Sequence, residues 1–465
     1  MSAPIVWILV PICVGALLLF ITNQRALSVL GGSMALVLAL IALFVPIELA
    51  MKLGPLSLKI DSSFTILGRV LLIQPTEGPL LALIYGAAAL WFFGAEASKM
   101  APRLVPLGFM IIGLMVASIA VEPFLYAALF IEMAILLAIP MLTSLRRPPG
   151  RGVVRFLIYQ TLAMPFILLA GWLLGGVEAS PGDLALAAQS AAMLGLGFAF
   201  LLAIFPLYSW IPLLLEETSP YLVGFLLWIL PTMTLIFGAG FLDRYSWLRS
   251  SEQLTLALRY IGLLMVVTGG GFAAFQRHLG RIMGYGSIAE TGFSLVALSL
   301  DFKVGIPILF LLIPARALGL AVWSLSLTII KENVETMRFG AARGILRVVP
   351  LASAGMIVAA LSTGAFPLLA GFPARLALWE GLSRISIASA LWMMIGIIGL
   401  LTSAFRSLAV ISGAEEYASW ERRESLAQVL MLGVGMLGLF FLGLFPQTLQ
   451  FLLENLPLMF EHLGR

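Results

Sequence analysis

The sequence predicts an all-α polytopic membrane protein with about fourteen transmembrane helices. Hydrophobic residues make up 61% of the 465 residues and charged residues only 11%. A soluble protein of this length would need far more polar surface. Apolar stretches of about 18 or more residues recur along the chain, each long enough to cross a hydrocarbon core of about 30 Å as a helix. Their polarity does not alternate residue by residue, which excludes a transmembrane β-barrel.

The first apolar stretch has no basic start and no clear small-residue cleavage site, so we interpret it as a retained span rather than a signal peptide. The segment 54–73 alternates in polarity and contains β-branched residues, which predicts an interfacial hairpin instead of a span. The expected spans cover residues 5–22, 27–48, 77–95, 104–121, 123–143, 153–175, 184–205, 221–242, 255–276, 281–300, 304–330, 348–372, 386–411 and 426–452.

Lysine and arginine are unevenly divided between the two sets of loops. The loops on the side of the first loop carry more of them, including Arg146, Arg147 and Arg277, than the loops on the other side, which include Arg465. Because basic loops stay in the cytoplasm, this places both termini on the non-cytoplasmic side of a cell (inner or plasma) membrane. The net charge of +4 follows from this asymmetry. We therefore expect a lipid bilayer as partner and no nucleic acid.

The chain offers no set of ligands for a redox centre. It contains one cysteine, Cys13, and two histidines, His278 and His462. Iron–sulfur, zinc and haem sites need more soft or imidazole ligands than these. The nucleotide-binding patterns GxGxxG and GxxxxGK[ST] do not occur. We therefore expect no cofactor and no metal in this chain, so that the electrons of any coupled redox process travel elsewhere.

Two apolar segments, FPLYSWIP and FPLLAGFP, share the frame F-P-L-x-x-x-x-P. The frame places Pro206 and Pro212 six residues apart, and Pro367 and Pro373 likewise. Proline removes a backbone donor and clashes with the preceding turn, so each pair predicts a helix break. Broken helices at corresponding places in two halves favour a transporter built from inverted repeats. The alternative is two ordinary proline kinks that happen to match.

An ionisable side chain in the middle of a span costs at least about 2.5–3.5 kcal/mol and so requires a reason. Glu132 lies at the centre of an expected span with apolar residues on both sides. An apolar environment favours the neutral form of a carboxylate, so Glu132 could take up and release a proton near neutral pH. The alternative is a static partner for an arginine on a neighbouring helix.

Arg375 lies just after the second proline frame. Arginine stays protonated in proteins, so Arg375 cannot carry a proton, but it can fix the charge of a nearby carboxylate or organise water. Its alternative is snorkelling to the membrane interface. Glu380 and Arg384 lie four residues apart, the spacing of an ion pair on one helix face.

Further charges accompany the breaks and kinks. Glu216 and Glu217 follow the first frame; repulsion should make one of them hold its proton more tightly, unless both only cap or solvate a helix end. Arg316 follows a proline inside the eleventh expected span, where it could pair with a carboxylate. Glu290 lies in the tenth and is either buried or interfacial. His278 stands among basic loop residues, where a solvated histidine or a charge partner is expected.

Four segments carry a resemblance to a known family. The chain resembles the antiporter-like membrane subunits of respiratory complex I, which are related to Mrp-type cation/proton antiporters and membrane-bound hydrogenases. The likeness covers approximately residues 104–411. The segments that carry it are RIMGYGSIAETGF (281–293), LSTGAFPLLAGFPARLALWE (361–380), FIEMAILLAIP (130–140) and FPLYSWIP (205–212).

The resemblance implies two inverted five-helix repeats, formed by spans 4–8 and 9–13, each with one broken helix and a water-filled half-channel. Glu132 matches the family's essential carboxylate, and Arg375 matches its lysine after the second break. The implied units are N-terminal helices 1–3 with the hairpin (1–103), the first repeat (104–242), the second repeat (255–411) and a C-terminal helix (412–465).

The sequence also departs from the family pattern. The family has a lysine shortly before the first frame and another in the eighth span, whereas residues 194–204 and 223–238 contain no ionisable side chain. Leu213 stands where an aspartate is usual, and Arg375 does not deprotonate. Either protons take a different path, through Glu132, Glu216, Glu217, Glu290 and Glu380, or this copy no longer pumps.

The resemblance predicts a membrane-arm subunit of a complex I-like (NADH/quinone or related) oxidoreductase. Such a chain has no redox centre and couples electron transfer in partner subunits to proton translocation, so its expected partners are other membrane subunits. A non-pumping scaffold or coupling subunit of the same fold is the alternative, as is a subunit of an Mrp-type antiporter. An autonomous secondary transporter ranks third, because the spans offer few polar residues to coordinate a substrate.

Overall fold

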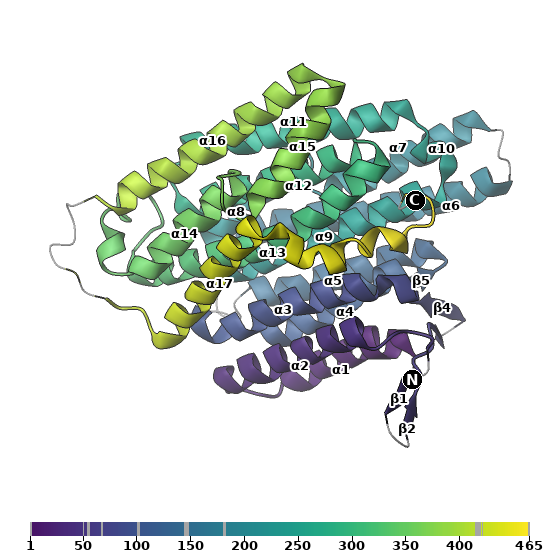
Figure 1. Cartoon of the computed structure of the whole chain (residues 1–465), viewed down its shortest axis with the longest axis horizontal. Coiled ribbons are helices and arrows are strands. Elements are labelled where there is room, and N and C mark those ends of the chain that lie inside the picture. The colour runs from purple at the N-terminus through teal and green to yellow at the C-terminus, as the bar shows by residue number, and fades with distance from the viewer. Residues whose placement is uncertain are drawn as a thin grey trace.

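Long apolar helices run roughly side by side in a computed structural model of the chain (Figure 1). Arg146, Arg147 and Arg465, which contributed to the expected orientation, lie outside the described residues. The structure describes residues 2–49, 51–53, 56–66, 68–99, 103–143, 148–179, 183–413, 420 and 422–463.

In this part of the chain, nine helices are long and apolar enough to cross a membrane by length and composition. The coarse prediction of a mostly helical membrane protein is therefore confirmed. Short turns, η2 (Pro75–Glu77) and η3 (Phe124–Tyr126), lead into two of them. The nine are α2 (Gln24–Phe44), α3 (Gly78–Ser98), α5 (Ala127–Leu142), α6 (Arg151–Ala179), α9 (Pro220–Arg244), α11 (Glu252–Phe275), α13 (Phe302–Asn333), α16 (Ile387–Ile411) and α17 (Leu426–Leu444).

Other helices are shorter or less apolar. Four apolar segments of 10–17 residues lie in η1 (Ile5–Leu9) with α1 (Val10–Leu18), in α4 (Leu104–Ala120), in α7 (Leu184–Leu201, where the segment starts at Ala185) and in α14 (Pro350–Thr363). The remaining elements are η4 (Leu207–Ser209), α8 (Trp210–Glu217), α10 (Ser246–Arg249), α12 (Leu279–Leu298), η5 (Ile345–Arg347), α15 (Gly371–Ile385), η6 (Pro446–Leu449), α18 (Gln450–Leu453) and η7 (Leu456–Met459).

Three short strands lie in the segment 54–73, for which the sequence predicts a hairpin, and they pair with each other or with short strands outside it. One antiparallel pair joins β1 (Met51–Leu53) to β2 (Leu56–Leu58). A second sheet has the order β3–β4–β5, all antiparallel. Its strands are β3 (Ser63–Ile66), β4 (Arg69–Leu72) and β5 (Val121–Glu122).

The two ends of the chain lie toward the same end of the helices as these strands (Figure 1). At the start, Ser2 forms a parallel bridge with Asp61. At the other terminus, the carboxylate of Asp243, near the end of α9, accepts the backbone N–H groups of residues 461–463 at 2.7–2.9 Å. Each terminus is therefore held by specific contacts at this end.

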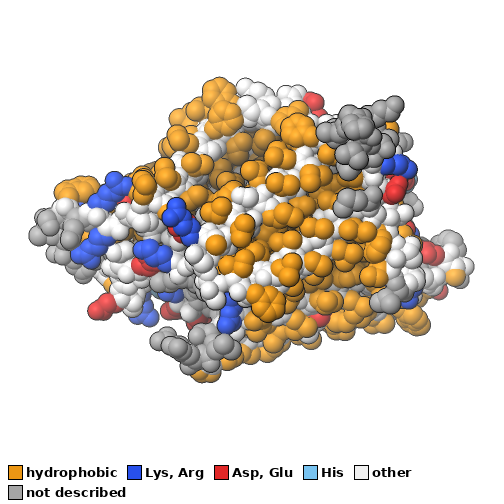
Figure 2. All heavy atoms as spheres, turned by 90° about the horizontal axis from the view of Figure 1, so that it is seen from below, with side chains coloured by type: hydrophobic (Ala, Val, Ile, Leu, Met, Phe, Trp, Pro, Cys, Tyr) orange, Lys and Arg blue, Asp and Glu red, His pale blue; other side chains and the backbone are white. Residues whose placement is uncertain are grey.

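The outer surface of the helices is apolar. Figure 2 shows hydrophobic side chains covering the middle of one face, with most of the visible Lys and Arg side chains toward one end. On α17, for example, Leu430 and Leu437 are 57% and 70% exposed. Exposed apolar area on this scale is rare on soluble monomers, and it suits contact with lipid.

Glycines let α11 and α16 pack backbone to backbone. A Cβ added to Gly270 would lie 2.0 Å from the carbonyl oxygen of Gly396, whereas one added to its neighbour Gly271 would meet nothing within 4 Å. Small residues allow such close approach between membrane helices. The contact anchors α16 to the rest of the second half.

We expect Gly270→Ala to destabilise the protein by about 1–3 kcal/mol, because the backbone it would strike cannot move aside as a flexible side chain can. Gly271→Ala is the matched control and should be neutral or slightly stabilising, since alanine favours helix more than glycine. Thermal unfolding of the purified variants measures both. Equal melting temperatures would contradict the close packing of α11 on α16.

Candidate functional site

Three charged side chains from three helices lie buried together in the second half. Glu290 comes from α12, Arg316 from near the middle of α13, and Arg375 from α15. They are 5%, 3% and 1% exposed, respectively. Two cations therefore face one anion in an apolar interior, where each ion pays a large desolvation cost.

Arg375 is the ion-pair partner of Glu290. Its Nη2 group donates to Glu290 Oε1, and its Nη1 group donates to the Gly371 carbonyl at 2.8 Å. The guanidinium carbon also lies 4.8 Å from the centre of the Phe293 ring. The sequence alternative of snorkelling to the interface is wrong, because the side chain is enclosed. Glu290 and Arg375 therefore form a buried ion pair between α12 and α15.

Arg316 bridges α13 to α9 and α12. Its Nη2 group donates to the Leu227 carbonyl at 2.9 Å and to Thr291 Oγ1 at 3.0 Å. Pro231 lies four residues after Leu227 inside α9 and has no N–H to offer that carbonyl. Arg316 thus supplies the donor that the helix lacks at this point.

Several donors in the cluster have no partner among the described residues. These are Nε and Nη1 of Arg316 and Nε of Arg375. Arg316 also lines two cavities of about 10 Å³ each. One reaches Gln160 and the first helix break, and the other reaches Thr232 and Ser294. A cavity of this size accommodates about one water molecule.

The first helix break separates α7 from α8. The backbone leaves the helix after Leu201, and Ala203 has a left-handed conformation with φ of 50°. Gln160 of α6 is 2% exposed, and its amide donates to the carbonyls of Phe200 and Leu201 at 3.3 Å each. A broken helix persists in a membrane only where protein or water satisfies such freed carbonyls.

The second break separates α14 from α15. Ala365 and Leu368 adopt left-handed conformations with φ of 57° and 71°, which costs about 1–3 kcal/mol for a residue other than glycine. The N–H of Gly371 donates to Ser362 Oγ at 3.1 Å. The Ser362 hydroxyl therefore ties the start of α15 to the end of α14.

The two prolines of each frame occupy equivalent positions in the two breaks. Pro206 and Pro367 lie in the non-helical connections, whereas Pro212 and Pro373 are each the third residue of the following helix. The first N–H groups of a helix have no intrahelical partner, so proline costs little there. The second proline of each frame therefore begins a helix and does not break one.

Glu132 lies apart from this cluster, on α5. Its Oε1 atom accepts a hydrogen bond from Thr161 of α6 at 2.9 Å, and its Oε2 atom is buried without a partner among the described residues. No described basic side chain forms an ion pair with it. Glu132 is therefore bound through a neutral hydroxyl, whereas Glu290 is bound through an arginine.

The adjacent carboxylates of α8 serve different helices. Glu216 accepts from Arg281 Nε at 3.0 Å, near the start of α12. Glu217 accepts from the N–H of Gly152 at 2.7 Å, in the first turn of α6, where a helix favours negative charge. Each therefore secures the start of a neighbouring helix.

Glu380 is also outside the buried cluster. It pairs with Arg384 at 2.5 Å, and the two side chains are 60% and 76% exposed. The spacing of four residues predicts this pair, and exposed pairs contribute little to stability.

The expectation of a solvated His278 is wrong. The residue precedes α12 and is 8% exposed, and its Nδ1 atom accepts from the N–H of Arg281 at 3.3 Å. Burial lowers the pKa of His278 to about 4, and nearby Arg281, Lys331 and Arg338 act in the same direction while Glu216 opposes them. The ring is therefore neutral at pH 7 and does not act as a charge partner.

The lowered pKa of His278 predicts an acid-sensitive fold. Between pH 6.5 and about 4 the unfolded chain binds a proton here that the folded chain does not, so stability should fall as the pH drops through this window. His278→Asn keeps a helix-capping acceptor and should flatten the dependence of the melting temperature on pH. His462→Asn, at an exposed site, is the control. An unchanged slope in His278→Asn would contradict the burial of a neutral ring.

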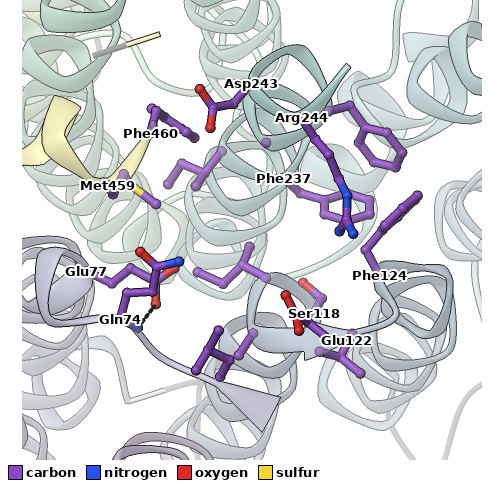
Figure 3. A pocket seen from close by; sticks show the side chains of 17 residues that line it. Gln74, Glu77, Ser118, Glu122, Phe124, Phe237, Asp243, Arg244, Met459 and Phe460 are labelled. Carbon is purple, nitrogen blue, oxygen red and sulfur yellow. Dashed lines mark hydrogen bonds between the residues drawn. The ribbon is translucent and has the colours of Figure 1, made fainter. Parts of the chain in front are cut away.

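A larger pocket, of about 210 Å³, lies where α4 and α9 end (Figure 3). Glu77, Glu122, Asp243 and Arg244 contribute its charges, and the guanidinium carbon of Arg244 lies 5.2 Å from the centre of the Phe124 ring. None of the residues predicted for proton translocation is among its described lining. The pocket is thus separate from the charged cluster.

The neutral polar residues of the site were not among the residues predicted from the sequence. Gln160 and Thr161 form an adjacent polar pair inside the apolar α6, which is a usable signal. Ser362 adjoins Thr363, and Thr291 adjoins Glu290, so a polar neighbour marks these residues in the same way.

Comparisons with known proteins agree with this fold. The family model described as NADH:quinone oxidoreductase/Mrp antiporter, TM, matches residues 180–406. NAD(P)H-quinone oxidoreductase chain 4 1 of Synechococcus sp. (strain JA-2-3B'a(2-13)) is 28% identical over 263 residues, which are 53% of this chain and 49% of that protein. NADH-quinone oxidoreductase subunit 14 of Thermus thermophilus is 27% identical over 322 residues, 65% and 71% of the two chains. The chain spans about half the length of the cyanobacterial relatives that it matches.

Solved structures share the fold along nearly the whole chain. A chain of the archaeal membrane-bound sulfane sulfur reductase superposes with a TM-score of 0.81 at 16% identity, covering 98% of this chain and 97% of that one. A chain of respiratory complex I from Thermus thermophilus superposes with a TM-score of 0.77 at 21% identity, covering 97% of this chain and 98% of that one. A chain of the Mrp complex from Dietzia sp. DQ12-45-1b superposes with a TM-score of 0.79 at 15% identity, covering 98% of this chain and 96% of that one. The resemblance seen in the sequence is thereby confirmed: residues 180–406 match the family model, and the whole chain shares its fold with membrane chains of complex I and of the Mrp complex.

Proposed function

We propose that this chain is a membrane-arm subunit of a complex I-like oxidoreductase and couples electron transfer in partner subunits to proton translocation. The observation that carries the proposal is the buried Glu290–Arg375 pair beside the second helix break. An ionisable cluster inside a membrane span is a functional site by default, because its desolvation cost is high. Electrons would travel in partner subunits, with no cofactor in this chain.

The membrane topology belongs to the same proposal. The nine long helices, the four shorter apolar segments and α12 would make fourteen crossings. The two inverted repeats would be α4 to α9 and α11 to α16, within the units 1–103, 104–242, 255–411 and 412–465. In each repeat the third helix, α6 or α13, packs against both halves of the broken fourth helix, which supports the correspondence. The excess of basic loops would place both termini outside the cytoplasm.

Proton movement in the second half would centre on Glu290. Arg375 occupies Oε1 of this carboxylate, so the guanidinium would have to move away before that oxygen could accept a proton from elsewhere. The start of α15, which carries Arg375, is attached to α14 through Ser362 and a strained connection, and a shift there would separate the pair. Water beside Arg316 would link this region to Gln160 at the first break.

A specific observation favours a second candidate function, a non-pumping coupling subunit of the same fold. Glu290 is held by a permanently charged arginine, and the polar groups at the first break, Gln160 and Thr161, do not titrate. A relay needs groups that can be neutral and charged in turn at modest cost. In this case the buried charges would hold α12, α13 and α15 in a fixed arrangement.

The companions of the chain test the proposal directly. Mild extraction from native membranes, followed by identification of co-purifying chains, should recover further antiporter-like membrane subunits together with redox subunits. Recovery with antiporter-like subunits only would favour the Mrp-type alternative. Recovery as a lone chain would count against both and favour an autonomous transporter.

Glu132→Gln separates a pumping subunit from a scaffold. If Glu132 carries protons, the substitution should reduce proton uptake into energised native vesicles at least tenfold, because glutamine cannot hold a titratable proton. Glu380→Gln, at an exposed pair, is the matched control and should leave uptake unchanged. Unaltered uptake in Glu132→Gln, with the assembly intact, would support the scaffold.

A further inference from the structure

A second charged cavity, of about 440 Å³, lies outside the buried cluster, at the junction of α11 and α12. Arg277, His278 and Arg281 line it from this junction, and Arg338 and Phe339 line it from the segment after α13. Arg277 and Arg338 are exposed, whereas His278 is buried. The cavity therefore offers arginine side chains to a ligand arriving from outside.

The backbone holds the two exposed arginines in place. The N–H of Phe339 donates to the Arg277 carbonyl at 2.9 Å, and the N–H of Leu279 donates to the Met337 carbonyl at 2.8 Å. These bonds form an antiparallel bridge between His278 and Arg338. Both guanidinium groups are thus attached to one small backbone unit before any ligand binds, which reduces the ordering cost of binding.

The charges of the cavity do not cancel. Glu216 is occupied by Arg281, to which it is joined by two hydrogen bonds. His278 is neutral at pH 7 for the reason given above. Neither Arg277 nor Arg338 forms an ion pair with a described carboxylate. Two positive charges therefore remain for an anionic ligand.

An apolar track leads away from the cavity along α11. Phe275, at the end of α11 next to Arg277, is 82% exposed, and Phe272 is 46% exposed. Leu264 and Tyr260 follow at helical spacing and are 42% and 63% exposed. At 1.5 Å per residue the track from Phe275 to Leu264 is about 16 Å long, close to half of a hydrocarbon core.

We propose that this cavity binds the headgroup of an anionic glycerophospholipid, with its acyl chains lying along α11. Arginine suits a phosphodiester because its planar fork donates to two phosphate oxygens at once. A ligand with an anionic head and an apolar tail matches both the unpaired arginines and the exposed aromatic side chains. The proposal is independent of whether the chain moves protons.

Lipid titration of the delipidated full-length chain, read by native mass spectrometry, tests the site. Dioleoyl-phosphatidylglycerol should bind more tightly than dioleoyl-phosphatidylcholine. The double variant R277Q/R338Q should lower the affinity for phosphatidylglycerol about thirtyfold, at about fivefold per arginine. R25Q removes a single exposed arginine, 81% exposed, and should change the affinity by less than twofold.

Further measurements distinguish a lipid headgroup from free inorganic phosphate as the ligand and control for the fold of the variants. Phe275→Ser should weaken binding of the dioleoyl lipid but leave competition by inorganic phosphate unchanged. R277K/R338K keeps the charge but not the planar fork, so its affinity should lie between those of the unmodified chain and R277Q/R338Q; it also controls for misfolding of the glutamine variant. The unmodified chain gives a test that needs no mutation. Its melting temperature should rise when phosphatidylglycerol is added and should not rise when phosphatidylcholine is added.

Equal affinity for the two lipids, or an unchanged affinity in R277Q/R338Q, would overturn the proposal. Displacement of the lipid by inorganic phosphate at similar concentrations would show a phosphate site instead. Protection of the cavity by a co-purified protein chain, with no lipid retained, would assign this surface to a subunit interface.

Discussion

Glu290→Gln is expected to lower the free energy of unfolding by about 3–5 kcal/mol, because it leaves Arg375 and Arg316 charged, buried and without a counter-ion. Glutamine keeps the volume of the glutamate side chain, so the effect isolates the lost charge. Denaturant unfolding of the purified chain in micelles, followed by circular dichroism, measures it.

The helix that carries Arg375, α15, provides the control. Glu380 and Arg384 form an ion pair within this helix, but this pair is exposed. Glu380→Gln should change the free energy of unfolding by about 1 kcal/mol or less. If both substitutions cost the same, the charge of Glu290 is not needed to compensate the buried arginines.

A double-mutant cycle then measures the pair itself. Arg375→Gln alone leaves Glu290 with Arg316 as its remaining buried cation, and the double variant removes both members of the pair. Coupling of about 0.5–3 kcal/mol between the two substitutions is expected for residues in direct contact. Additive effects would contradict a direct ion pair and would weaken the proposed role of Arg375 as the group that controls Glu290.

Gly371→Ala is expected to have the second large effect. A Cβ at Gly371 would lie 2.0 Å from the Ser362 carbonyl oxygen and 2.2 Å from Nη1 of Arg375. The end of α14, the start of α15 or the Arg375 side chain would have to move. Overpacking of this kind costs about 1–3 kcal/mol, and the loss of the Arg375 contacts would add to it. The melting temperature and proton uptake should therefore fall together.

Gly319→Ala is the matched control for this substitution. Gly319 lies on α13, three residues after Arg316, and a Cβ there would meet no atom within 4 Å. Alanine should be neutral or slightly stabilising, since it favours helix over glycine. If Gly371→Ala behaves like Gly319→Ala, the close approach of α14 and α15 at the second break is wrong, and with it the placement of Arg375.

The proline frames show what a local sequence pattern predicts about a helix break and what it does not predict. The two matching frames predicted interruptions near 205–212 and 366–373, and helices do end at Leu201 and Thr363 and resume at Trp210 and Gly371. The frames did not predict which proline lies in the connection. That depends on where the next helix finds partners for its first N–H groups, such as Ser362 for Gly371.

The sequence identified the charged residues of the site individually but did not predict which of them lie together. Glu290, Arg316 and Arg375 each stood out in the sequence as charges in or near apolar spans, yet their association did not. Glu290 and Arg375 are separated by 85 positions, and their pairing depends on how α12 and α15 pack. The role of Arg316 likewise depends on Pro231, which lies on a different helix and leaves the Leu227 carbonyl without a donor.

The sequence by itself determined that this chain is a helical membrane protein with two interrupted helices, because hydrophobic length and proline chemistry act over a few neighbouring residues. Only the tertiary structure decided which charges meet and which stay apart. It joined Glu290 to Arg375, gave Glu132 a neutral partner in Thr161 and left Glu380 on the surface. The physical reason is that the energy of a charge depends on burial and on partners brought in from other helices, and neither is a local property of the chain.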